Sequence, residues 1–241
     1  MVNRPDVRYP VISKRVVAIV GGFGSGKTEI SVNLAKYFVF TGHSRVTIID
    51  LDLVNPYFRS REAKAEMEAL GIRAVVPEGG NFYADLPILL PEIKGAIEKS
   101  EGKVILDVGG DAQGTRALGS LSEAFNRQDY EMLMVLNSRR PQTADVGRSI
   151  QTIERIEQSA RLRFTGLVSN SHMIEETDPD VLNEGYELSR EVSRKRGLPL
   201  VFISVKSDVL SRIDTAIFDC PILPLTRSML KPWEQNKSTE S

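Results

Sequence analysis

The sequence has a single cysteine, Cys220, in 241 residues, which excludes an internal disulfide and fits a reducing compartment. Its two histidines, His43 and His172, are far apart, and neither has a neighbour at metal-ligand spacing. The formal net charge is −1, so the strongly basic surface typical of nucleic-acid or membrane binding is not indicated. These shortages argue against a disulfide scaffold, a histidine metal site and a polycationic protein.

Long apolar runs are also missing. No apolar run approaches about 18 residues, so no membrane span is expected. Residues 1–15 are polar and lack the apolar core of a signal peptide, and we expect an N-terminal arm there. The polar tail at 231–241 lacks the amphipathic periodicity of a membrane-targeting helix. We therefore expect a cytoplasmic protein with no membrane role and no nucleic-acid partner.

The remaining composition is that of an ordinary globular protein, with 41% hydrophobic and 26% charged residues. No linker rich in proline, glycine or serine divides the chain. We expect one domain over residues 16–230, between the arm and the tail.

The most informative stretch runs from Gly21 to Thr28 and matches the pattern G-x-x-x-x-G-K-[ST]. An apolar run, Val16–Val20, precedes it and a helical pattern follows, which is the context that this P-loop motif requires. Its glycines let successive backbone N–H groups point at an anion. Lys27 can neutralise phosphate charge, and the Thr28 hydroxyl can coordinate Mg²⁺. A glycine-rich turn that binds nothing is the disfavoured alternative.

Apolar runs alternate with helical patterns along the domain. We expect strands at 16–20, 45–52, 72–76, 103–108, 131–136, 164–169, 200–205 and 221–225, and helices at 28–40, 59–70, 90–100, 112–127, 143–160 and 178–196. Recurring strand–helix units predict an α/β fold, a single-domain P-loop protein whose mostly parallel sheet has helices on both faces. Ligands of such sheets bind beyond the carboxyl ends of the strands. The polar residues expected at that edge are Lys27, Asp50, Asp52, Asp107, Asn137 and Asn170.

Asp107 ends the apolar run Val104–Leu106, where P-loop proteins place a carboxylate that holds Mg²⁺ or its water shell. Gly109 and Gly110 complete D-x-x-G, which can bring a backbone N–H to the γ-phosphate. The alternative is a surface aspartate in a glycine turn, and the upstream P-loop makes it the weaker one.

Asp50 and Asp52 end another strand two residues apart, so they project to the same side. One can join the outer shell of the metal, and the other can orient an attacking water. A polar strand end facing solvent is the alternative.

Together these three motifs resemble the MinD/ParA-like P-loop ATPases of the SIMIBI class, a group that includes nitrogenase iron protein and dethiobiotin synthetase. The resemblance implies ATP and Mg²⁺ as ligands. It makes Asp50 an outer-shell metal ligand and Asp52 the water-orienting residue, with Asp107 in the Walker B position. Gly109 and Gly110 would form switch II. Lys27 and Asp52 are then the catalytic residues, and Thr28, Asp50 and Asp107 the metal-binding ones.

The resemblance also implies a nucleotide-binding set. An asparagine that ends a later strand reads adenine in this family, and Asn170 stands there, while the segment from Val205 would flank the base. The full set is Gly22, Phe23, Gly24, Ser25, Gly26, Lys27, Thr28, Glu29, Asn170 and Val205.

The chain departs from the family in two places. Dimerising members carry a lysine at the second loop position, where this chain has Gly22, which argues against a dimer with lysine contacts across its interface. Metal-carrying relatives use paired cysteines, which a lone Cys220 cannot supply. The N-K-x-D sequence that usually reads guanine is also absent, which favours ATP over GTP.

Three further segments carry weaker signals. Arg59 or Arg61 could contact phosphate or a partner, or could be solvated arginines in the first turn of a helix. The loop at 78–83 is better explained as a plain connector than as a substrate or partner surface. The segment 137–143 ends a strand with two arginines, which suit an anion or a dimer contact, and Thr143 is a plausible helix cap.

The function that these residues predict is an Mg²⁺-dependent ATPase that acts as a nucleotide switch for a partner protein, with a homodimer left open. One alternative is an ATP-dependent ligase or kinase that acts on a small carboxylate, similar to dethiobiotin synthetase. A regulatory module that binds nucleotide without useful turnover is the other.

Overall fold

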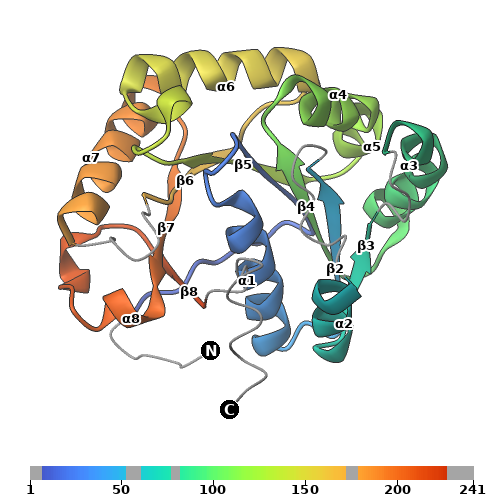
Figure 1. Cartoon of the computed structure of the whole chain (residues 1–241), viewed down its shortest axis with the longest axis horizontal. Coiled ribbons are helices and arrows are strands. Elements are labelled where there is room, and N and C mark those ends of the chain that lie inside the picture. The colour runs from blue at the N-terminus through green and yellow to red at the C-terminus, as the bar shows by residue number, and fades with distance from the viewer. Residues whose placement is uncertain (1–6, 53–60, 77–81, 172–178, 227–241) are drawn as a thin grey trace.

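A computed structural model describes residues 7–52, 61–76, 82–171 and 179–226, and shows one sheet with helices packed on both faces (Figure 1). The strands are β1 (Val16–Gly21), β2 (Val46–Leu51), β3 (Ile72–Val75), β4 (Lys103–Gly109), β5 (Tyr130–Leu136), β6 (Gly166–Ser169), β7 (Leu200–Lys206) and β8 (Ile222–Leu225). Their order in the sheet is β3-β2-β4-β1-β5-β6-β7-β8, and each neighbouring pair is parallel. The predicted α/β fold with a parallel sheet is confirmed.

The helices are α1 (Lys27–Phe40), α2 (Arg61–Ala69), α3 (Phe82–Lys99), α4 (Ala112–Ser120), α5 (Ser122–Asn126), α6 (Val146–Ala160), α7 (Pro179–Arg196) and α8 (Ser207–Leu210), with 3₁₀ turns at Pro141–Thr143 and Thr215–Ile217. Figure 1 shows α1 and α2 in front of the sheet, and α4 and α6 near each other at its upper edge. No helix among the described residues has the length and apolarity needed to cross a membrane.

Alternation along the strands builds a core on each face of the sheet. In β1, Val16, Ala18 and Val20 face one cluster, whereas Val17 and Ile19 face the other. The first cluster takes apolar residues from α3 to α7, and the second takes them from α1 and α2. Because both faces are covered, β1 is buried along its whole length, and only its carboxyl end leads to a polar site.

Three predicted helix boundaries are wrong. The helix expected at 90–100 begins earlier, at Phe82, and its Ile93 and Ile97 pack in the first core. The helix expected at 112–127 breaks at Leu121, whose N–H turns back to Leu118 O. Thr143 does not cap α6.

The cap of α6 is Asp145, whose side chain accepts a hydrogen bond from Arg148 N. Thr143 lies in a preceding 3₁₀ turn, where its hydroxyl donates to Asn137 O at 2.7 Å. The Thr143 hydroxyl thus bonds to the residue just past the end of β5, and Asp145 takes the N-cap position instead. Local sequence preference alone does not reveal this contact.

Residues 7–15 run along the amino ends of the strands without forming a helix or strand. Lys103, at the start of β4, is buried there and donates from Nζ to Ile12 O and Lys14 O at 2.6 and 2.7 Å. Burial lowers the pKa of Lys103, and these carbonyls replace the water that the ammonium has lost. Lys103 therefore fastens this segment to the sheet.

Replacing Lys103 by Met should lower the free energy of unfolding by about 2–3 kcal/mol, since the buried Ile12 carbonyl and the partly buried Lys14 carbonyl lose a charged donor. Urea denaturation measures the change. Lys99→Met, at the exposed end of α3, is the matched control and should stay within about 0.5 kcal/mol of the unmodified chain. Equal stability of the two variants would show that Lys103 does not fasten the segment.

Candidate nucleotide-binding site

The candidate site lies at the carboxyl edge of β1, β2 and β4. The register of the parallel strands places Asp50 beside Asp107, and Gly21 beside Gly109. Lys27 begins α1 directly after the loop that leaves β1. Residues as far apart in the sequence as Gly21 and Gly109 thus meet because strand ends coincide.

The backbone of the loop depends on two glycines with left-handed conformations. Gly24 has φ +71° and Gly26 has φ +87°, values that other residues adopt only with strain. Gly26 is also the residue from which α1 starts. The loop is closed internally by Ser25 N donating to Gly22 O at 3.0 Å. This is the curled backbone that the motif predicts.

Two side chains from later strands hold the loop from outside. Arg140 donates from Nε to Gly24 O at 2.7 Å, and Asn170 donates from Nδ2 to Ser25 O at 2.6 Å. Because peptide units are planar, fixing these carbonyls also fixes the direction of the N–H groups that follow them. The Asn170 amide also accepts through Oδ1 from the Ser204 hydroxyl. Both ends of this amide therefore contact protein.

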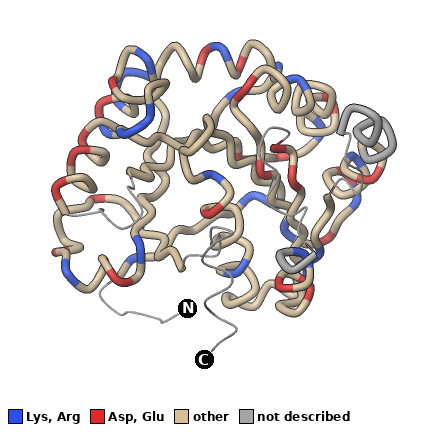
Figure 2. The backbone as a smooth tube through the Cα atoms, in the orientation of Figure 1, with Lys and Arg blue, Asp and Glu red and all other residues tan. Residues whose placement is uncertain are grey.

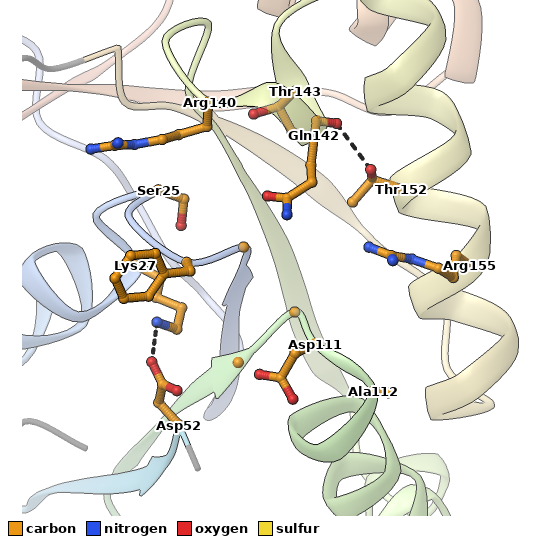
Figure 3. A pocket seen from close by; sticks show the side chains of 14 residues that line it. Ser25, Lys27, Asp52, Asp111, Ala112, Arg140, Gln142, Thr143, Thr152 and Arg155 are labelled. Atoms are coloured by element: carbon orange, nitrogen blue, oxygen red, sulfur yellow. Dashed lines mark hydrogen bonds and ion pairs between the residues drawn. The ribbon is translucent and has the colours of Figure 1, made fainter. Parts of the chain in front are cut away.

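Lys27 is buried and forms an ion pair with Asp52 (Figure 3). Asp50 and Asp107 are also buried, so three buried carboxylates of the described residues lie around Lys27. Burial alone would lower the pKa of Lys27, but the charges of Asp107, Asp52 and Asp50 together raise it. Lys27 is thus held as a cation. The buried carboxylates offer oxygen ligands of the kind that Mg²⁺ and its water shell take.

Two buried atoms of the site have no hydrogen-bond partner among the described residues, namely Ser25 Oγ and Asp107 Oδ2. Such atoms are rare in folded proteins and mark places for a ligand, ion or water. Burial raises the pKa of Asp107, and the charge of Lys27 opposes that shift. These features fit Mg²⁺ held partly by nucleotide phosphates and water. The described residues contain no cluster that could cage a metal with protein ligands alone.

Gly109 and Gly110 lie against the loop and the acidic residues. Gly110 N donates to Gly21 O at 2.8 Å, and a Cβ at Gly110 would approach the Gly21 carbonyl carbon to 2.9 Å. A Cβ at Gly109 would lie 2.5 Å from Asp111 Oδ2. Asp111 caps α4 by accepting from Gln113 N at 2.7 Å. The predicted switch segment therefore touches the P-loop directly.

The other predicted residues lie at varied distances from this centre. Thr28 is buried at the first turn of α1, and Phe23 is exposed at the loop surface. Glu29 accepts from Asn33 Nδ2 at 3.2 Å on α1. The Val205 side chain is fully buried in β7, so only its backbone can face a base. The segments around Arg59 and at 78–81, and His172, lie outside the described residues.

A cavity of about 220 Å³ opens beside Lys27 and Asp52 (Figure 3). Its walls come from the P-loop, the switch glycines with the start of α4, the turn at 140–143 and α6. The lining residues that the sequence did not single out are Asp111, Ala112, Thr152 and Arg155. Arg140 lines it, whereas the neighbouring Arg139 turns away to pair with Glu184 at 2.6 Å. Of the two arginines in the segment 137–143, only Arg140 therefore lines the cavity.

No family model matches the chain, and no curated protein matches it significantly. Among solved structures it is similar to the cell division protein FtsY from Thermotoga maritima, with 20% identity over 83% of this chain and 64% of that one, at a TM-score of 0.55. It is also similar to chloroplast FtsY from Physcomitrella patens, with 18% identity over 84% of this chain and 62% of that one, at a TM-score of 0.52. A third similar structure is the signal recognition particle 54 kDa protein from Aeropyrum pernix in complex with GDP, with 19% identity over 83% of this chain and 43% of that one, at a TM-score of 0.55.

The chain spans 64%, 62% and 43% of the lengths of these three proteins, which is less than two thirds in each case. At identities of 18–20% the likeness shows the fold. The chain has the fold of these proteins, a parallel sheet with helices on both faces, as its sequence predicted.

Replacing Lys27 by Ala should weaken ATP binding about 100-fold, because the loop loses its charged phosphate donor. Calorimetric titration measures the affinity, and circular dichroism checks that the variant folds. Lys36→Ala, also on α1 but paired with Glu66 at 2.7 Å, is the control and should bind normally. Unchanged affinity in the Lys27 variant would contradict the assignment of the loop.

Replacing Asn170 by Ala should weaken both ATP and base-free triphosphate about fivefold, because Ser25 O loses the bond that orients the loop. A further loss for ATP alone would measure the predicted adenine contact. Asn183→Ala, exposed on α7, is the control. Unaltered triphosphate affinity in the Asn170 variant would show that this bond does not shape the phosphate site.

Proposed function

We propose that the chain binds ATP with Mg²⁺ at the Gly21–Thr28 loop, hydrolyses it, and signals the state of the nucleotide to a partner protein. The observation that carries the proposal is the buried Lys27 among Asp50, Asp52 and Asp107. A buried cation among three buried carboxylates, with Ser25 Oγ and Asp107 Oδ2 unbonded within the described residues, suits a magnesium–phosphate group better than a structural ion pair.

Binding is proposed to exchange one partner of Lys27 for another. In the structure Asp52 neutralises the ammonium. The phosphates of ATP offer more negative charge in the same place, and the unpaired Ser25 hydroxyl can donate to them. Once Lys27 turns to phosphate, the Asp52 carboxylate is released to accept a hydrogen bond from the attacking water.

Mg²⁺ would be held by the Thr28 hydroxyl and phosphate oxygens, with Asp50 and Asp107 bound to its water shell. The ion supplies charge neutralisation at the phosphates. Asp107 Oδ2 supports this role because it is a buried acceptor without a donor among the described residues.

Switching is proposed to pass through Gly109 and Gly110. The bond from Gly110 N to Gly21 O joins this segment to the P-loop, and α4 follows immediately. A γ-phosphate that attracts a backbone N–H here would move the start of α4. A partner protein that contacts α4 or its neighbours could thereby distinguish ATP from ADP.

The choice of ATP over GTP rests on the sequence. The chain lacks N-K-x-D, and Asn170 follows β6 where adenine would be read. The Aeropyrum pernix structure holds GDP, so guanine is the competing base to test. Parallel titrations with ATP and GTP decide between them.

Phosphoryl transfer to a small carboxylate is the second candidate function. The cavity of about 220 Å³ is below the roughly 300–1,000 Å³ of usual small-molecule pockets, and it must also take the γ-phosphoryl group. That size favours water as the acceptor. ATP turnover that depends on an added small acid would reverse this preference.

The cellular location and the kind of partner are proposed from the composition. One cysteine supports a reducing compartment, the cytoplasm. Lys and Arg alternate with Asp and Glu along the tube in Figure 2, which supports a protein partner or a second copy more than nucleic acid.

Asp52→Ala should keep ATP binding and slow hydrolysis about 100-fold, because Lys27 stays available while the water loses its acceptor. Phosphate release under saturating ATP measures the rate. Asp129→Ala, an exposed carboxylate, is the control. An unaltered rate in the Asp52 variant would remove its catalytic role.

A further inference from the structure

The proposed hydrolysis requires that negative charge on the γ-phosphate be stabilised during the reaction. Phosphoryl transfer builds up negative charge on the γ-phosphate oxygens, and many enzymes meet it with a cation supplied beside the P-loop lysine. The loop position that could supply one is Gly22, which has no side chain. A Cβ there would lie 2.7 Å from Gln142 Oε1, so the chain's own Gln142 occupies the adjoining space.

Arg155 lines the same cavity as Gly22 and belongs to α6. It projects from α6 into the cavity that Lys27, Asp52 and Gly110 line (Figure 3). No hydrogen bond or ion pair to Arg155 is found within the described part of the chain. The contrast with its helix neighbour Arg148 is clear, because Arg148 lies 3.2 Å from Asp145 Oδ2 and does not line the cavity.

Arg140, the other arginine of the cavity, already has a task. Its Nε donates to Gly24 O, and a Cβ at Gly24 would lie 2.8 Å from its Cζ, so the guanidinium is packed against the outside of the loop. Arg155 is therefore the arginine of the cavity that bonds to no other residue of the described chain and is not packed against the loop. Its planar fork of five N–H donors matches phosphate oxygens.

We propose that Arg155 contacts the γ-phosphoryl group of ATP bound to the same chain and stabilises its transfer to water. This rests on the proposed function and adds that hydrolysis needs no lysine or arginine from a second copy. The oxygen of water bonds to the γ-phosphorus, and the bond from that phosphorus to the bridging oxygen breaks. ADP leaves with the electron pair, and the water proton passes to Asp52 and then to solvent. Arg155 stays protonated throughout.

Arg155→Ala should lower kcat on the order of 100- to 1,000-fold, the loss seen when one donor to a transition state is removed. Its affinity for a non-hydrolysable ATP analogue should change less than about threefold, because the contact strengthens only as charge develops. Arg155→Lys should recover part of kcat, and Arg148→Ala should match the unmodified chain. Wild-type turnover in Arg155→Ala, or a loss of analogue affinity as large as the loss of kcat, would overturn the proposal.

Mixing variants tests whether the contact is made within one chain. Lys27→Ala lacks a working P-loop but keeps Arg155, and Arg155→Ala has the converse defect. If Arg155 acts within its own chain, an equimolar mixture stays as inactive as either variant, and specific activity is independent of protein concentration. Recovery of activity in the mixture would show action across two chains. Failure of the unmodified chain to bind ATP would instead contradict the proposed function, which separates the two claims.

Discussion

The structure depends on how a buried lysine is neutralised. Lys27 cannot be buried at the start of α1 without a counter-charge, and Asp52 at the end of β2 supplies it. The register that sets Asp50 beside Asp107 brings two more carboxylates to the same place. Both faces of the sheet are covered by apolar cores, so these charged residues lie at the carboxyl ends of the buried strands. The fold therefore concentrates charge where the parallel strands end.

Three buried carboxylates around Lys27 suit an exchange of partners. A magnesium–phosphate group would bring both a cation for the carboxylates and a stronger anion for Lys27. The Gly110–Gly21 hydrogen bond and the close approach of Gly109 to Asp52 Oδ1, 3.3 Å from a Cβ built at Gly109, connect that exchange to the segment before α4. In this account nucleotide binding and switching are one electrostatic event.

The sequence predicted the parts of the site that local patterns encode. An apolar strand, a glycine loop and an aspartate at a strand end are each visible within a few residues, so Lys27 and Asp107 could be singled out, and the predicted fold class is confirmed. Arg155 was not singled out, because it lies within an amphipathic helix and only the packing of α6 beside the loop places it at the cavity. The choice of Asp145 over Thr143 as a cap, and the bond from Asn170 to Ser25 O, also depend on contacts between distant segments.

The most direct test of the account is a crystal structure of the chain with Mg²⁺ and a non-hydrolysable ATP analogue. The account predicts that Lys27 Nζ leaves Asp52 and contacts the phosphates. It also predicts that Thr28 ligates Mg²⁺ and that Asp107 Oδ2 accepts from a metal-bound water. A nucleotide bound elsewhere, or one bound at the loop with the Lys27–Asp52 pair intact, would contradict it.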